Sequence, residues 1–255
     1  MMIYTDDRLL ILDADGTTID AFSAIEQTFA AHHMRIGDLE RFQKRRHMFK
    51  YLGGLKEFPR NLRRQLGRQK RAQLVATLTD VYREQAMLYP GIAAWLNELV
   101  RHDGLRVGIV TRNITHEPVT TLRRLLTRQQ VDVDGLDFIE HVPLRQSKVE
   151  TFRQVREGFA INPACAYACG DEKTDYAAAL GAGMHPFMVS YGFEDFERLT
   201  TKIGVPAELI SRTPAEFRER VGHALGGRGQ PAVVPVQGVR GWHGAAAARG
   251  RATAG

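Results

Sequence analysis

The sequence has little cysteine and no long apolar run. Cys165 and Cys169 are its only cysteines in 255 residues, and four residues of extended strand span about 13 Å, which is too far for a disulfide. No apolar stretch approaches the roughly eighteen residues that cross a membrane. Asp6 and Asp7 precede a hydrophobic run that is short and lacks the basic start of a secretory signal. We therefore expect a cytoplasmic protein with no disulfide and no membrane partner.

The amino-acid composition of the chain is also free of any extreme. Hydrophobic residues make up 44% of the chain and charged residues 25%, which excludes collagen-like and fully disordered proteins. A chain of 255 residues is long enough for one large domain, or for a core that carries an inserted module.

Short apolar runs recur along the chain, and a helical pattern follows each of them. The runs are 8–13, 105–111, 136–142, 165–171 and 185–190. Their apolarity is continuous and does not alternate, which is typical of parallel strands covered by helices on both faces. The fold class that we expect is α/β, with a doubly wound, Rossmann-like parallel sheet.

One interval lacks strands. Residues 21–88 contain only helix-like patterns, with apolar residues at steps of three and four, and this predicts an all-helical insert. The predicted catalytic core is then residues 1–20 and 89–221, and the predicted cap is residues 21–88. Residues 222–255 are rich in glycine, alanine, proline and arginine and are predicted to form a disordered tail.

The stretch "ILDADGTTID" places Asp13 and Asp15 directly after the first apolar run. Side chains two apart on a strand point the same way, so both acids should project into the crevice where α/β sheets bind ligands. Gly16 and Thr17 then allow a tight turn with free N–H groups and a hydroxyl. Two carboxylates about 4 Å apart repel by about 4 kcal/mol at an effective dielectric near 20, so the pair should hold a cation or a proton.

Other strand ends supply matching side chains. Thr111 ends the second predicted strand, and Arg112 and Asn113 follow it into the same loop. Lys148 opens a predicted helix, and the fourth predicted strand ends in "GDEKTD", which contributes Asp171 and Asp175. The carboxyl ends of parallel strands meet at one edge of the sheet, so we expect these groups to converge.

These residues resemble the four motifs of the haloacid dehalogenase superfamily of phosphotransferases. The first motif, Asp-x-Asp-Gly-Thr, is matched by residues 13–17, and the second, Thr or Ser at a strand end, by Thr111. Lys148 matches the third motif. Gly170-Asp171 and Asp175 match the fourth, and "YAAALGAGM" follows it as in the family. The helical insert resembles the cap of the subfamily that includes phosphoglycolate phosphatase.

The resemblance implies a role for each residue. Asp13 would attack phosphorus and form an aspartyl-phosphate, and Asp15 would act as general acid and then general base. Mg²⁺ would be held by Asp13, the Asp15 backbone carbonyl and Asp171, with support from Asp175. Thr111 and Lys148 would hold the phosphoryl oxygens. Gly16, Thr17, Arg112 and Asn113 are further candidates for contact with phosphate or substrate.

The expected activity is hydrolysis of a small phosphorylated metabolite, such as phosphoglycolate or a sugar phosphate. Asp15 disfavours two neighbouring chemistries, because the family's dehalogenases lack this second acid and its phosphonoacetaldehyde hydrolases resemble Asp-x-Ala-Gly-Thr-Thr. A phosphomutase keeps both acids and stays open as an alternative, and an enzyme similar to phosphonoacetaldehyde hydrolase also stays open although Asp15 disfavours it.

A basic segment supports an alternative of another class. Residues 41–71 contain twelve lysines and arginines and one acid, Glu57. Such a field attracts polyanions, so a protein that binds nucleic acid or an acidic partner on a hydrolase scaffold also stays open. The interpretation of this segment without a binding function is that its basic side chains cover a solvated helix face.

Overall fold

The computed structural model describes residues 3–33 and 71–226. Its strands are β1 (Arg8–Leu12), β2 (Leu105–Thr111), β3 (Phe138–His141), β4 (Ala166–Gly170), β5 (His185–Val189) and β6 (Ile210–Ser211). Its α-helices are α1 (Ala21–Ala31), α5 (Arg71–Glu84), α6 (Ile92–Leu99), α7 (Pro118–Arg128), α8 (Lys148–Gly158), α9 (Lys173–Gly181) and α10 (Pro214–Gly226). Three short helical segments, η2 (Pro163–Cys165), η3 (Arg198–Ile203) and η4 (Ala207–Leu209), complete the described elements.

The strands form one parallel sheet in the order β3-β2-β1-β4-β5-β6. The chain builds outward from β1 to β3 and then returns to build from β4 to β6 on the other side, so the order reverses between β1 and β4. Open α/β sheets bind ligands beyond the carboxyl ends of the strands at such a reversal. The predicted α/β, doubly wound class is confirmed. The sequence interpretation missed β6, which is two residues long.

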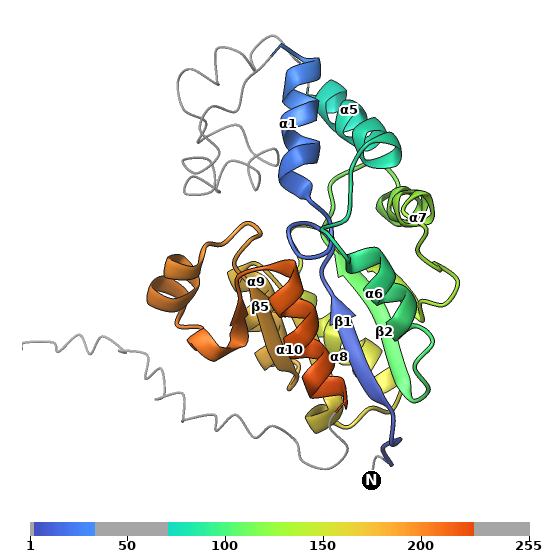
Figure 1. Ribbon diagram of the computed structural model, residues 1–255, viewed down its shortest axis with the longest axis vertical. Coiled ribbons are helices and arrows are strands. Elements are labelled where there is room, and N and C mark those ends of the chain that lie inside the picture. The colour runs from blue at the N-terminus through green and yellow to red at the C-terminus, as the bar shows by residue number, and fades with distance from the viewer. Residues whose placement is uncertain (1–2, 34–70, 227–255) are drawn as a thin grey trace, which may run out of the picture.

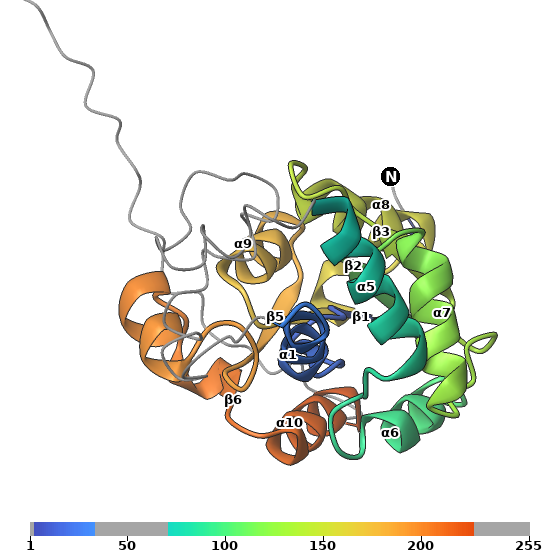
Figure 2. The same ribbon diagram turned by 90° about the horizontal axis from the view of Figure 1, so that it is seen from above.

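Strand β1 shows why both faces of the sheet must be covered. Leu9 and Ile11 pack with α8 and α9 in one cluster, whereas Leu10 and Leu12 pack with α6, α7 and α10 in another. Each of these four side chains is fully buried. Successive strand residues point to opposite faces, so a run without alternation needs helices on both sides, as Figure 2 shows.

Helices α1 and α5 stand beyond the carboxyl ends of the strands (Figure 1). They pack on each other through buried residues such as Phe22 and Leu78. The two chain segments that connect the sheet to these helices lie side by side, because the Asp20 N–H of one donates to the Met87 carbonyl of the other at 2.9 Å. Both helices belong to the predicted insert, and the rest of that insert, residues 34–70, lies outside the described residues.

Helix α10 passes the predicted end of the core at residue 221. It continues to Gly226, and Leu225 is buried in the main cluster. Residues 227–255 of the predicted tail lie outside the described residues, so the domain boundaries stay a prediction. None of the helices in residues 3–33 and 71–226 is both long and apolar enough to span a membrane.

Candidate active site

Asp13 is fixed at the centre of the sheet edge. It follows β1 directly, and its N–H donates to the Cys169 carbonyl of β4 at 2.9 Å, which continues the pairing of the two strands by one residue. The pleat of β1 points odd-numbered side chains toward α8 and α9. The carboxylate of Asp13 therefore reaches the N-terminal ends of those two helices.

Lys148 and Asp175 stand at those helix ends. Ser147 caps α8 by accepting a hydrogen bond from the Val149 N–H, so the helix begins at Lys148. The Lys148 Nζ lies 2.7 Å from Asp13 Oδ1 and 2.7 Å from Asp175 Oδ1. Asp175 Oδ2 accepts the Glu172 N–H at 3.0 Å, so both oxygens of Asp175 already face donors.

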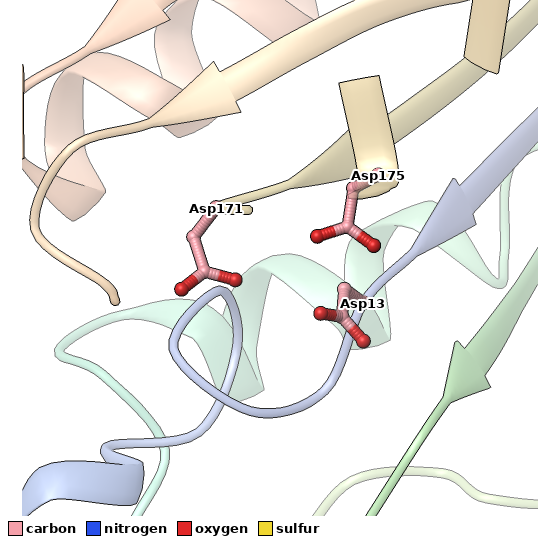
Figure 3. A group of neighbouring side chains, drawn as sticks. All are labelled: Asp13, Asp171 and Asp175. Atoms are coloured by element: carbon pink, nitrogen blue, oxygen red, sulfur yellow. The ribbon is translucent and has the colours of Figure 1, made fainter. Parts of the chain in front are cut away.

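Asp171 completes a group of three acids. It follows β4 as Asp13 follows β1, and Asp13, Asp171 and Asp175 offer carboxylate oxygens that lie within 4.8 Å of one another. Figure 3 shows the three carboxylates converging from the loop after β1, the end of β4 and the start of α9. Asp171 accepts hydrogen bonds from the Thr17 hydroxyl at 3.3 Å and from the Phe193 N–H.

The turn after β1 explains why glycine stands at position 16. Gly16 adopts φ +80°, and a Cβ there would collide with the Asp171 carboxylate, so a larger residue would meet both backbone strain and a clash. The Thr18 and Ile19 N–H groups close the turn by donating to the Ala14 carbonyl. The predicted tight turn at Gly16 and Thr17 is present, and it packs against Asp171.

Asp15 occupies surroundings different from those of Asp13. Strand β1 ends at Leu12, so the two acids do not share a regular strand face as the sequence pattern suggested. The Tyr82 hydroxyl of α5 donates to Asp15 Oδ1 at 2.6 Å, and the Asn113 Nδ2 lies 3.1 Å from both Asp15 oxygens. The acids are thus held by separate sets of partners.

Thr111 is the last residue of β2, and Arg112 follows it. β2 pairs with β1, so Thr111 is at the level of the residues that follow β1. Its side chain is fully buried, and its hydroxyl oxygen accepts the Asn113 N–H at 3.0 Å. The Nε of Arg112 is buried without a hydrogen-bond partner among the described residues.

Burial has the largest effect on the pKa values of Asp13 and Asp171. Burial, with a further contribution from Asp175, outweighs the opposing Lys148 ammonium and raises the pKa of Asp13 to about 8. Burial, then the charges of Asp13 and Asp175, raises the pKa of Asp171 well above its usual value. Burial lowers the pKa of Lys148, but the two carboxylates beside it outweigh that effect and raise it overall. The site therefore favours the uptake of positive charge.

We expect the substitution Asp171→Asn to stabilise the metal-free protein. A carboxyl whose pKa is raised by folding loses stability as the pH rises from about 4, its unfolded value, through the raised folded value. Asparagine carries no such charge, its Oδ1 can accept the Phe193 N–H, and the Thr17 hydroxyl can accept from its Nδ2. Thermal unfolding in EDTA at pH 8 should shift upward by roughly 2–6 °C.

The pH dependence checks the cause of that shift. The gain should shrink as the pH falls toward about 4 and should vanish below it, where the wild-type carboxyl is protonated in both states. An unfolding temperature of Asp171→Asn that lies below that of the wild type at pH 8 in EDTA would contradict this account of the charge.

Sequence comparison decides the family. A family profile described as haloacid dehalogenase-like hydrolase matches residues 8–183, a span that contains Asp13, Lys148, Asp171 and Asp175. The chain belongs to the haloacid dehalogenase-like hydrolases. The predicted family and the prediction of an enzyme are confirmed. No curated protein shows a significant match to this hydrolase.

Solved structures share its fold. A predicted phosphoglycolate phosphatase from Haemophilus somnus is 16% identical with a TM-score of 0.56, and the match covers 86% of this hydrolase and 99% of that chain. A protein assigned as a β-phosphoglucomutase from Thermotoga maritima is 20% identical with a TM-score of 0.58, over 85% and 99% of the chains. A mutant of CbbY from Rhodobacter sphaeroides in complex with xylulose-(1,5)bisphosphate is 20% identical with a TM-score of 0.56, over 84% and 96%.

Two residues at the site of this hydrolase were not predicted from the sequence. Tyr82 lies in "VYREQ", which reads only as part of an amphipathic helix, and its contact with Asp15 depends on how α5 packs. Phe193 contributes a backbone N–H to Asp171, a role that any residue except proline could fill, so no side-chain signal marks it.

Proposed function

We propose that this hydrolase is a Mg²⁺-dependent phosphatase that cleaves the phosphate monoester of a small metabolite through an aspartyl-phosphate on Asp13. One observation carries the proposal: a buried carboxylate at the end of the central strand is paired with Lys148 and lies beside Asp171 and Asp175. A nucleophile in such a site needs neighbouring positive charge to approach an anionic phosphate.

The residues of the acidic group fit Mg²⁺. Their donors are all carboxylate oxygens, which Mg²⁺ prefers, and burial together with the neighbouring carboxylates raises the pKa values of Asp13 and Asp171. Asp13, the Asp15 backbone carbonyl and Asp171 would hold the ion. Asp175 would support it indirectly, because its two oxygens face Lys148 and the Glu172 N–H. When bound, the ion would offset charge on the phosphoryl oxygens.

Asp13 and Asp15 would divide the chemistry. Asp13 attacks phosphorus, and the bond from phosphorus to the leaving oxygen breaks as Asp15 gives that oxygen a proton. Asp15 then removes a proton from the water that attacks the aspartyl-phosphate, and inorganic phosphate leaves. Burial raises the pKa of Asp15 against the opposing hydrogen bonds of Tyr82 and Asn113, which favours the protonated form that the first step requires.

The remaining predicted residues keep proposed roles in binding. Lys148 would offset charge on Asp13 and on the phosphoryl group. Thr111 and Arg112 come from the carboxyl end of β2, and their hydroxyl and guanidinium groups suit phosphate oxygens. Gly16 and Thr17 shape the turn against Asp171. Asn113 contacts Asp15, so we assign it a role in holding the general acid/base beside its predicted contact with phosphate or the leaving group.

The structural neighbours support a small phosphorylated substrate. One is named as a phosphoglycolate phosphatase, and another is a complex with a sugar bisphosphate. The caps of such enzymes supply contacts to the part of the substrate that does not react. The basic segment 41–71 belongs to the predicted cap, and all of it except Arg71 lies outside the described residues.

Release of inorganic phosphate tests this function. Purified protein should release phosphate from one or more phosphorylated metabolites in a screen with Mg²⁺, and EDTA should lower the rate at least about 100-fold. Product analysis by NMR separates the second candidate, a phosphomutase, which a structural neighbour's name and the presence of both acids favour. A sugar phosphate that isomerises without free phosphate would contradict the phosphatase.

The alternative that the basic segment supports, binding of nucleic acid or an acidic partner, has its own test. Retention of an oligonucleotide at low ionic strength, lost steeply with added salt, together with no Mg²⁺-dependent phosphate release would favour that alternative. Phosphate release without any retention would remove it.

A further inference from the structure

We propose that Tyr82 is a positioning residue that orients the Asp15 carboxyl so that one defined oxygen, Oδ2, delivers the proton to the leaving group. The inference rests on the proposed function and extends it to a helix outside the four motifs. Tyr82 belongs to α5, its side chain is 2% exposed, and its hydroxyl lies 2.6 Å from Asp15 Oδ1.

Asn113 fixes the second side of the carboxyl. The Thr115 N–H can only donate, and it donates to Asn113 Oδ1 at 2.8 Å. The Thr115 hydroxyl donates to the same oxygen. The amide nitrogen must then face Asp15, where it lies 3.1 Å from each oxygen. The amide cannot flip without breaking two hydrogen bonds, so it is a rigid donor to Asp15.

Tyr82 and Asn113 give the two oxygens of the Asp15 carboxyl different numbers of hydrogen-bond donors. Oδ1 faces two donors, the Tyr82 hydroxyl and the Asn113 amide, whereas Oδ2 faces the amide alone. A proton on Oδ1 would oppose the Asn113 amide and force the Tyr82 hydroxyl to change from donor to acceptor, so the acid form of Asp15 carries its proton on Oδ2. In the first step that proton passes to the leaving oxygen, which keeps the electron pair of the broken phosphorus–oxygen bond, and Asp15 becomes a carboxylate.

Hydrogen bonds hold helix α5 against the core, and they therefore fix the position of Tyr82. The His116 N–H donates to the Thr79 hydroxyl at 2.9 Å, and the Arg83 Nε donates to the Thr121 hydroxyl at 3.1 Å. The Arg128 guanidinium donates to the Arg83 and Ala86 carbonyls at the end of the helix. These contacts come from the loop after β2 and from α7, and they involve residues on either side of Tyr82 in the sequence. Together they hold the Tyr82 hydroxyl beside Asp15.

The test compares leaving groups in Tyr82→Phe. A nitrophenolate leaves without a proton, whereas an alkoxide needs one, so a variant that misplaces the acid should harm only the second reaction. In single-turnover experiments with Mg²⁺, release of the alcohol from an alkyl phosphate should slow about 10–100-fold. Release of nitrophenolate from 4-nitrophenyl phosphate should change less than about 3-fold, and the KM for both esters should stay within about 3-fold.

Two controls make the comparison strict. Tyr167→Phe removes a hydroxyl from a ring within β4 that packs on Phe187, and it should leave both rates unchanged. Adding Tyr82→Phe to Asp15→Asn should produce no further loss with the alkyl phosphate, because both changes act on one proton transfer.

Three results would overturn the inference. The first is an equal loss of rate with both esters, which a merely structural role of Tyr82 predicts. The second is no loss of rate with either ester. The third is an additive loss of rate in the double variant. A wild-type protein that releases neither leaving group would instead contradict the proposed function, and the inference with it.

Discussion

Asp13→Asn is expected to abolish turnover of phosphate monoesters, with a fall of at least about 10⁴-fold, while the protein stays folded. An amide is a far weaker nucleophile than a carboxylate and cannot form the aspartyl-phosphate. Its oxygen can still accept the Ala14 N–H that Asp13 Oδ1 accepts at 2.8 Å, and Lys148 keeps its partner Asp175. Phosphate release and thermal unfolding measure the two parts of this prediction.

Asp20→Asn is the matched control for that substitution. Asp20 caps α1 by accepting the Ser23 N–H, and asparagine caps a helix about as well as aspartate, so activity and stability should stay close to those of the wild type. Retained activity in Asp13→Asn, with Asp20→Asn also active, would contradict the role of Asp13.

Lys148→Met is expected to harm both stability and activity. The Lys148 side chain is 2% exposed, and its ammonium contacts two carboxylates at 2.7 Å. Removing one partner of a buried charge cluster costs about 3–5 kcal/mol of unfolding free energy, and loss of charge opposite the phosphoryl group should lower kcat about 10²–10⁴-fold. Denaturant unfolding in EDTA and phosphate release with Mg²⁺ measure the two effects.

The stability loss should depend on pH with a defined sign. Without Lys148 the pKa of Asp13 loses its opposing charge and rises further, so the loss is largest at high pH and shrinks as the pH falls toward about 4 and the Asp13 carboxyl takes up a proton. The double variant Lys148→Met/Asp175→Asn should recover part of the stability but none of the activity. Lys173→Met, at an exposed neighbouring position, should change neither. A destabilisation that does not vary with pH would contradict the electrostatic explanation.

Much of the site could be predicted because parallel strands place their carboxyl ends together. Asp13 and Asp171 follow β1 and β4, which the structure pairs, and Thr111 ends β2 as expected. Lys148 was placed at the start of a helix, and the pleat of β1 brings Asp13 to it. In each case the position depends on local strand and helix signals that the sequence carries.

The surroundings of Asp15 could not be predicted in the same way. The expectation that Asp13 and Asp15 share one strand face fails because β1 ends at Leu12 and the chain turns at Gly16. Tyr82 is separated from Asp15 by 67 residues, and its contact follows from the packing of α5 on α7, which no local pattern specifies. A contact of Asn113 with phosphate or the leaving group stays a prediction, and what the sequence did not indicate is that Thr115 orients the Asn113 amide toward Asp15.

The most direct test of the central claim is to locate the phosphoryl group during turnover. We expect that acid quenching of the enzyme within one turnover of a labelled phosphate monoester, followed by borohydride reduction and peptide mass spectrometry, will convert Asp13 to homoserine. Asp20 and Asp171 should stay unmodified. Conversion at another acid, or full hydrolysis with every acid unmodified at all quench times, would contradict covalent catalysis through Asp13.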